Sequence, residues 1–178
     1  GRNDYFYEPV GKDSQEIKIF TGPTRTSAIL QEVENELNEP DEGIDLQEID
    51  EIDFVFPYRH YLHGDAQFAL KQCQKIIAIC QKNQITNKII LETELFPNSE
   101  QLYQLARLLL DNGCHFLKTS TGKLPKGADP FSVFILLKAL SDSNINAGIK
   151  ISGGIKEMNQ AYTYTLMAEK KMQKPIDP

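Results

Sequence analysis

Short apolar segments alternate with longer helical patterns five times along the chain. The apolar segments lie at 17–20, 52–56, 88–93, 114–118 and 147–151. Regular alternation of strands and helices is typical of right-handed crossovers and a parallel sheet. We therefore expect an α/β fold whose functional side chains gather at the carboxyl ends of the strands.

Apolar residues at helical spacing predict the helices between these strands. The helix that Asp129 and Pro130 open is almost wholly apolar, as expected for a helix that lies between two others. The other expected helices have polar residues at their ends that act as caps or stops. They span roughly 25–38, Gly64-Asp65 to Gln81, Asn98 or Ser99 to Asp111-Asn112-Gly113, and Lys156 to Lys171.

Composition excludes several classes of protein. The chain has 178 residues, of which 40% are hydrophobic and 25% charged, as in one globular domain with a sizeable core. A net charge of −6 gives no electrostatic support to nucleic-acid binding. We expect no membrane span, because no apolar run is long enough. The first residues contain no hydrophobic signal segment, so we expect a cytoplasmic protein.

Cysteine and histidine spacing predicts no metal site. Cys73, Cys80 and Cys114 lie in apolar settings and are odd in number, so buried thiols are expected rather than disulfides. Their spacing relative to the histidines matches no zinc pattern. The acidic stretch 39–51 lacks the Asp-x-Asp-x-Asp-Gly order of a calcium loop and is expected to be a solvated insertion.

Two of the predicted strands end in a lysine that is followed by a turn of small residues. Lys118 precedes Thr-Ser-Thr-Gly-Lys, and Lys150 precedes Ile-Ser-Gly-Gly. A lone lysine at such a place usually extends its ammonium to water. If the two strands are parallel neighbours, however, the amines lie close together and at least one has a lowered pKa. A lysine that is neutral near neutral pH is a usable nucleophile.

Carboxylates accompany the lysines at the strand ends. Asp53 lies between Ile52 and Phe54, and Glu92 and Glu94 end the strand that begins near Lys88. An outward position on an edge strand would explain Asp53 without a function. The lysines at the neighbouring strand ends favour instead an Asp that points into a shared site.

Four segments together resemble the deoxyribose-phosphate aldolase family. They are EIDFVFPYR (51–59), KIILETEL (88–95), FLKTSTGK (116–123) and GIKISGGIK (148–156). The resemblance extends from about Glu16 to Lys171. It implies a (β/α)₈ TIM barrel, of which only about five of the eight β/α units are evident. Residues 1–178 are accordingly expected to form a single aldolase-type barrel domain that is incomplete at both ends, with 39–51 as an insertion.

The resemblance also implies an activity and a site. Members of the family are class I aldolases of deoxyribonucleotide catabolism. They cleave 2-deoxy-D-ribose 5-phosphate to D-glyceraldehyde 3-phosphate and acetaldehyde through a lysine Schiff base, without a metal or cofactor. By position, Lys118 matches the Schiff-base lysine, Lys150 the lysine that lowers its pKa, and Asp53 the carboxylate that moves protons. The residues expected to bind the substrate and its phosphate are Thr121, Gly122, Lys123, Gly153 and Gly154.

A helix that opened at Gly153-Gly154 would offer free backbone N–H groups to the phosphate. The sequence departs from the family nearby, because Ile151-Ser152 stands where members usually have Pro-Ala. The acidic link 39–51 is also longer than usual.

These departures leave a second function open, that of a weak or inactive aldolase relative acting as a binding or scaffold module. A different Schiff-base or phosphate-binding barrel enzyme is a third possibility, against which KTSTGK (118–123) argues. The expected partner is a small phosphorylated sugar or aldehyde. The sequence is compatible with a homo-oligomer but does not specify one.

Overall fold

The structure is a computed structural model that describes residues 17–19, 49–173 and 175. Residues 1–16, the helix expected at 25–38 and most of the acidic stretch 39–51 lie outside the described residues. The last two residues of that stretch, Asp50 and Glu51, are exposed.

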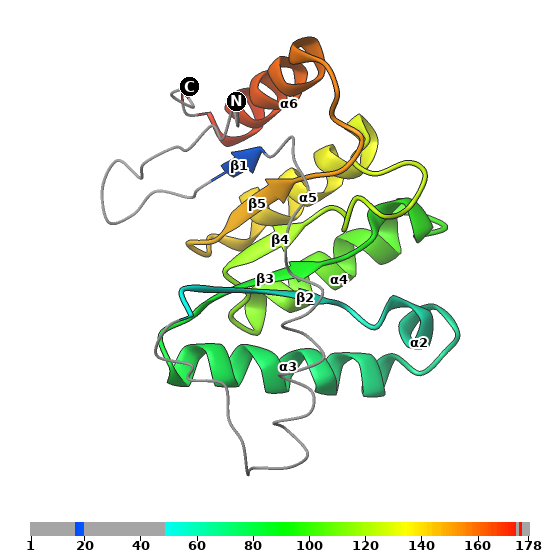
Figure 1. Cartoon of the computed structure of the whole chain (residues 1–178), viewed down its shortest axis with the longest axis vertical. Helices are drawn as coiled ribbons and strands as arrows, with labels where there is room; N and C mark the ends of the chain where they lie inside the picture. Colours follow the sequence, from blue (N-terminus) through cyan, green and yellow to red (C-terminus); the bar gives the residue numbers. More distant parts are fainter. Residues whose placement is uncertain (1–16, 20–48, 174, 176–178) are drawn as a thin grey trace.

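The described strands form one parallel sheet in the order β1-β5-β4-β3-β2 (Figure 1). Strands β2, β3 and β4 each pair with the next strand along the chain, as right-handed β/α units do, and β5 also pairs with β1. The predicted alternation and the α/β class are thereby confirmed. The strands are β1 (Ile17–Ile19), β2 (Glu51–Val55), β3 (Thr86–Ile90), β4 (Phe116–Lys118) and β5 (Gly148–Ile151).

The helices follow the strands along the chain. They are α2 (Tyr58–Leu62), α3 (Ala66–Lys82), the 3₁₀ turn η2 (Thr93–Leu95), α4 (Ser99–Asp111), α5 (Pro130–Ser143) and α6 (Met158–Met172). Helix α5 contacts both α4 and α6, which confirms its expected place between two helices. Its Phe131 and Phe134 are nevertheless exposed. No helix in the described part of the chain is long and apolar enough to cross a membrane.

Side-chain caps fix three of the helix starts. Asp65 accepts a hydrogen bond from the N–H of Phe68, and Asn98 accepts one from the N–H of Gln101. Asp129 accepts from two amides of the first turn of α5. Such caps satisfy amide donors that have no partner inside the helix. The predicted starts of these three helices are therefore confirmed, with Asn98 rather than Ser99 as the cap of α4.

Other expected boundaries are wrong. Strand β3 ends at Ile90 rather than at 93, because Glu92 takes a left-handed backbone conformation and η2 follows. Strand β4 begins at Phe116 rather than at 114. Helix α6 begins at Met158, so no helix opens at Gly153-Gly154. Helix α2 had no counterpart among the expected elements.

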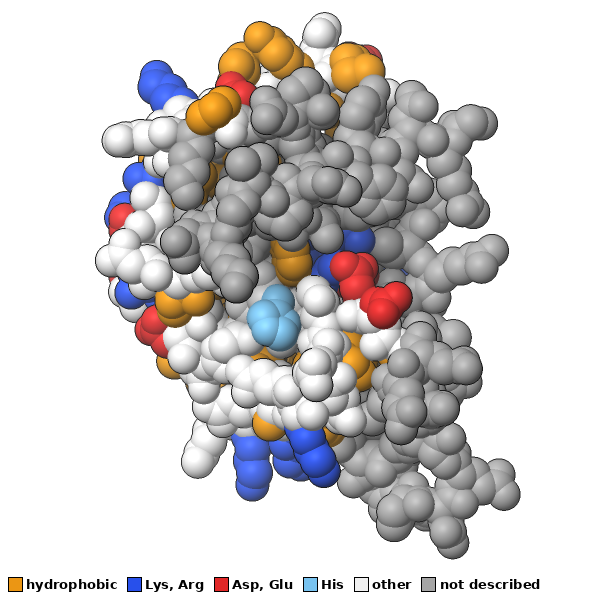
Figure 2. All heavy atoms as spheres, turned by 90° about the vertical axis from the view of Figure 1, so that its left-hand side faces the viewer, with side chains coloured by type: hydrophobic (Ala, Val, Ile, Leu, Met, Phe, Trp, Pro, Cys, Tyr) orange, Lys and Arg blue, Asp and Glu red, His pale blue; other side chains and the backbone are white. Residues whose placement is uncertain are grey.

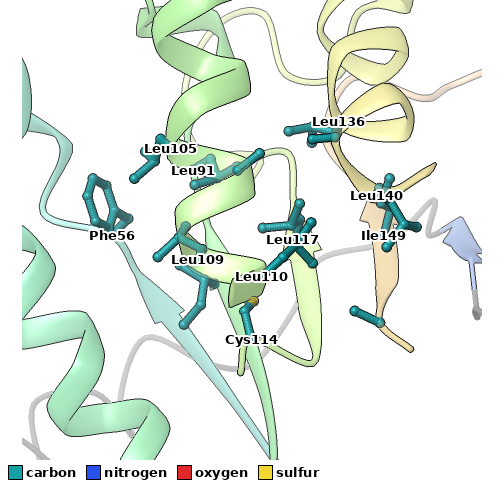
Figure 3. Packing of buried hydrophobic residues seen from close by; sticks show 14 of the residues in the cluster. Phe56, Leu91, Leu105, Leu109, Leu110, Cys114, Leu117, Leu136, Leu140 and Ile149 are labelled. Atoms are coloured by element: carbon teal, nitrogen blue, oxygen red, sulfur yellow. The ribbon is translucent and has the colours of Figure 1, made fainter. Parts of the chain in front are cut away.

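Alternate residues of each strand face opposite sides of the sheet. One set packs with the helices in a hydrophobic core, as Leu117 and Ile149 do with Leu109 and Leu136 (Figure 3). The three cysteines are free and buried, as predicted, and none forms a disulfide. The other face of the sheet carries the charged residues of the strands, and these define the site.

Candidate active site

Lys118 and Asp53 form a buried ion pair. The Nζ of Lys118 lies 2.6 Å from Oδ2 of Asp53, and the two side chains are 0% and 2% exposed. Asp53 comes from β2 and Lys118 from the end of β4, 65 residues later. Burial by itself would raise the pKa of Asp53, but the positive charges of Lys118, Lys88 and Lys150 hold that pKa below its usual value. Asp53 is therefore ionised, and the sequence was right to place it beside the lysines.

Lys88 is a third buried lysine that the sequence analysis did not select. It is the register partner of Asp53 across β2 and β3, and its Nζ lies 3.6 Å from Oδ1 of Asp53. It also pairs with the carboxylate of Glu51 at the start of β2. The signal available in the sequence was a lysine within a largely apolar strand. Its register position faces the same side of the sheet as Asp53. In Figure 2, which faces the left-hand side of Figure 1, acidic and basic side chains meet near the middle of the surface.

Lys150 faces the same side of the sheet as Lys118, since the two are register partners across β4 and β5. Burial, followed by repulsion from Lys118, lowers the pKa of Lys150 to about 8, although the nearby Asp53 carboxylate opposes this shift. The prediction that at least one of the paired lysines has a lowered pKa is thereby confirmed for Lys150. This amine changes charge within about one pH unit of neutrality.

Hydroxyl groups join the loops that follow β4 and β5. The N–H of Ser152 donates to Oγ1 of Thr119, and the hydroxyls of Thr119 and Ser120 both donate to the carbonyl of Ser152. The hydroxyl of Ser152 donates in turn to the carbonyl of Ser120 over 2.7 Å. All three residues are buried. The side chain of Ser152, one of the two departures from the family pattern, thus supplies one of these hydrogen bonds between the loops.

Glycines let these loops approach each other closely. Gly153 has a φ of +85°, and a Cβ there would lie 2.2 Å from Oγ of Ser120 and 3.3 Å from Cα of Gly122. Gly127 has a φ of +103°, and a Cβ there would lie 2.6 Å from the carbonyl carbon of Gly153. Both positions therefore require glycine for conformation and for space. The expected phosphate residues Gly122 and Gly153 are brought together in this way.

The amides of the expected phosphate site differ in their partners. The N–H of Gly122 donates to Oγ of Ser120, and that of Lys123 donates to Oγ1 of Thr121. Among the described residues, the N–H groups of Gly153 and Gly154 donate no hydrogen bond. They lie in a loop before α6 rather than at its first turn. An anion would therefore be held by loop amides rather than by a helix N-terminus.

A separate cavity of about 570 Å³ lies beside β2 and the helices that follow it. Its walls are formed by residues between Phe54 and Lys75, including Phe56, Tyr58 and Phe68. None of the expected catalytic or substrate-binding residues lines it. This cavity is not the candidate site, because it lacks the buried lysines.

Solved structures resemble this chain. No family model matches it. The tetrameric deoxyribose-phosphate aldolase of Aeropyrum pernix is 29% identical with a TM-score of 0.56, over 67% of this chain and 47% of that one. QR15, an aldolase, is 24% identical with a TM-score of 0.57, over 66% and 51% of the two chains. A candidate deoxyribose-phosphate aldolase of Toxoplasma gondii is 20% identical with a TM-score of 0.62, over 88% and 61%.

The chain therefore spans about half of two of these proteins and three fifths of the third. The described sheet is part of an α/β fold of the TIM-barrel type, as expected. The resemblance of the sequence to the deoxyribose-phosphate aldolase family is thus confirmed in the structure of the chain.

Proposed function

We propose that this chain carries the site of a class I aldolase that cleaves 2-deoxy-D-ribose 5-phosphate. The observation that carries the proposal is the buried constellation of Lys118, Asp53 and Lys150. Buried ionisable groups with shifted pKa values are costly to fold and are concentrated at functional sites. Three lysines and the two carboxylates of Asp53 and Glu51 leave a net positive charge in a largely buried place, as an enzyme that handles an amine and an anionic sugar requires.

In the proposed reaction, the neutral amine of Lys118 attacks the aldehyde carbon C1 of the open-chain sugar, and loss of water gives an imine. A base removes the proton from the C3 hydroxyl, and the C2–C3 bond breaks. Glyceraldehyde 3-phosphate leaves, and the electron pair remains on the imine as an enamine. Protonation of C2 and hydrolysis release acetaldehyde and the free lysine.

The roles of the other two groups follow from their charges. Asp53 positions Lys118 through their contact of 2.6 Å, and the amine of Lys118 has to be neutral when it attacks. Lys150 is its register partner, and repulsion between the two ammonium groups favours loss of a proton from the pair. Asp53 serves proton transfer in the carbinolamine and enamine steps.

Reductive trapping tests this proposal. Acetaldehyde or the sugar phosphate with borohydride should add mass to the peptide that contains Lys118. Lys118→Met should abolish the adduct and the cleavage, whereas Lys138→Met, at a half-exposed lysine of α5 that pairs with Asp142, should leave both unchanged. A label on Lys150 alone would show that Lys150, and not Lys118, forms the Schiff base. No label at saturating aldehyde would favour the alternative of an inactive relative that serves as a binding or scaffold module.

The phosphate site is proposed to consist of Thr121, Gly122, Lys123, Gly153 and Gly154. It is supported by the close approach of the two loops and by the loop amides of Gly153 and Gly154. Inorganic phosphate should then inhibit competitively, and unphosphorylated deoxyribose should be a much poorer substrate. Binding of the remote phosphate positions the reacting carbon, so its loss should lower turnover as well as affinity. Equal rates for both sugars would exclude this role.

A further inference from the structure

Glu92 has an unusual backbone for its residue type. It follows β3 with φ 52° and ψ 60°, in the left-handed region, although it is not glycine. The residue is 2% exposed. A side-chain-bearing residue in this region costs on the order of 1–3 kcal/mol and persists only where its surroundings fix it.

Backbone hydrogen bonds fix the residues on both sides of Glu92. The N–H of Leu91 donates to the carbonyl of Lys118, and the N–H of Thr93 donates to the carbonyl of Thr119. Two residues after β3 therefore advance against one residue after β4, which leaves Glu92 as an extra residue between the two bonds, as in a β-bulge. The left-handed turn at Glu92 occurs between these two bonds, beside the expected Schiff-base lysine.

The carboxylate of Glu92 binds the loop after β4. Its Oε1 accepts a hydrogen bond of 3.0 Å from the N–H of Thr121. Among the described residues, its buried Oε2 has no hydrogen-bond partner, and neither has the buried hydroxyl of the adjacent Thr93. Glu94 holds the far end of the same loop, because its Oε2 accepts from the N–H groups of Lys126 and Gly127.

We propose that Glu92 is a positioning residue that holds the backbone of Thr121 so that residues 121–123 can bind a phosphorylated substrate. This inference rests on the proposed function of the site. Thr121 in turn accepts the N–H of Lys123 through its hydroxyl, so one hydrogen-bonded series extends from Glu92 to the exposed lysine of the loop. The strained backbone at Glu92 places the carboxylate at the start of this series.

Three substitutions separate the hydrogen bond from the strain. Glu92→Ala removes the carboxylate and keeps the strain, and Glu92→Gly removes both, since glycine adopts a positive φ freely. Glu92→Gln keeps an acceptor oxygen for Thr121. Glu100→Gln, at an exposed residue of α4 that contacts Gln104, is the matched control. Calorimetry with inorganic phosphate gives a dissociation constant that does not depend on activity.

The Ala and Gly variants should bind phosphate about tenfold or more weakly, because a part-buried hydrogen bond to a charged group is lost. KM for the sugar phosphate should rise by a similar factor. Trapping of acetaldehyde at Lys118 should not change, since acetaldehyde carries no phosphate. The Gln variant should remain within about threefold of the unaltered chain, and the Glu100 control should match it.

Several results would overturn this role. Unchanged phosphate affinity in the Ala and Gly variants would do so, as would an equal loss in the Gln variant. Failure of both the Ala and Gly variants to fold would show that Glu92 serves the fold itself. Absence of phosphate binding by the unaltered chain would show that residues 121–123 form no phosphate site for Glu92 to position. Failure of acetaldehyde trapping in the unaltered chain refutes the aldolase proposal instead, and the phosphate titration still decides the role of Glu92.

Discussion

At the scale of single residues, the charges of the site converge on Asp53. It lies within 2.6 Å of Lys118 and 3.6 Å of Lys88. Breaking a buried ion pair by removing one partner is costly, because the remaining charge stays buried. Asp53 therefore serves the fold as well as the proposed chemistry, and substitutions that keep its shape distinguish the two.

Asp53→Asn keeps the shape and removes the charge. We expect trapping of acetaldehyde at Lys118 to persist, because the imine still forms, while turnover falls by about 10²-fold or more at every pH, since proton transfer is lost. Parallel trapping and steady-state assays measure this. Asp50→Asn, at an exposed acid just before β2, is the control. Loss of trapping together with turnover would contradict the assigned role.

Lys88→Met tests the lysine that the sequence analysis missed. Its positive charge is one of those that lower the pKa of Lys150. Removing it should therefore raise that pKa above about 8 and shift the rising, acidic limb of the pH–rate profile, along which the lysines lose a proton, to higher pH. Lys82→Met, at the exposed end of α3, should leave the profile in place. An unmoved profile in the Lys88 variant would show that Lys88 acts only through Glu51.

At the scale of elements, the loops after β4 and β5 form one unit. Hydroxyl–backbone hydrogen bonds among Thr119, Ser120 and Ser152 connect them, and Gly127 lies against Gly153. Ser152, which stands where the family usually has Ala, therefore adds a hydrogen bond between the two loops rather than disrupting their packing. The packing of two loops, not the start of a helix, shapes the proposed phosphate site.

Gly127→Ala and Gly64→Ala form a matched pair that tests this packing. Both glycines have similar φ values, +103° and +98°, but a Cβ at Gly64 meets nothing within 4 Å. Gly64→Ala should thus cost about 1–3 kcal/mol of unfolding free energy, from backbone strain alone. Gly127→Ala should cost clearly more and weaken inhibition by phosphate, because it forces the loops apart. Equal costs in chemical denaturation would show that the loops can separate freely.

Ser152→Ala, which restores the usual residue of the family, removes the hydrogen bond to the carbonyl of Ser120. A buried carbonyl that loses its donor costs about 1–3 kcal/mol, so unfolding free energy should fall by that amount. Ser143→Ala, at a part-buried hydroxyl that donates within α5, is the control and should cost less. A neutral Ser152→Ala would show that the other inter-loop hydrogen bonds suffice.

At the scale of the whole molecule, buried Lys150 makes stability depend on pH. The pKa of Lys150 is lowered to about 8 from an ordinary value of 10.5, so the folded chain binds fewer protons than the unfolded chain between these values. Unfolding free energy therefore rises with pH through this window as the cost of the buried charge disappears. The buried thiols act in the opposite direction, because burial raises the pKa of Cys80 to about 11 and that of Cys114 to about 12.

The difference in unfolding free energy between the unaltered chain and the Lys150→Met variant isolates the contribution of Lys150. The unaltered chain should gain stability relative to Lys150→Met as pH rises from about 8 to 10.5, since both proteins contain the same thiols. Urea denaturation at several pH values measures this difference. A difference that stays constant with pH would show that the amine is not titrating in this range.

The sequence by itself determined the alternation of strands and helices apart from α2, the caps at Asp65 and Asp129, and the lysines at or near the ends of β4 and β5. These features are local, because apolar periodicity and capping side chains act over a few residues. The four family-like segments added the expected roles of Lys118, Lys150 and Asp53. The structure then placed Asp53 against Lys118, and Lys118 in register with Lys150.

Only the tertiary structure decided which partners these residues have. Register across β2 and β3 brings Lys88 to Asp53 and Glu51, and no local pattern encodes a pairing between residues more than thirty positions apart. The left-handed turn at Glu92 and the close approach of Gly127 to Gly153 depend likewise on how separate loops pack. A local pattern placed the lysines at their strand ends, whereas burial and neighbouring charge, which are properties of the folded chain, set the pKa of Lys150.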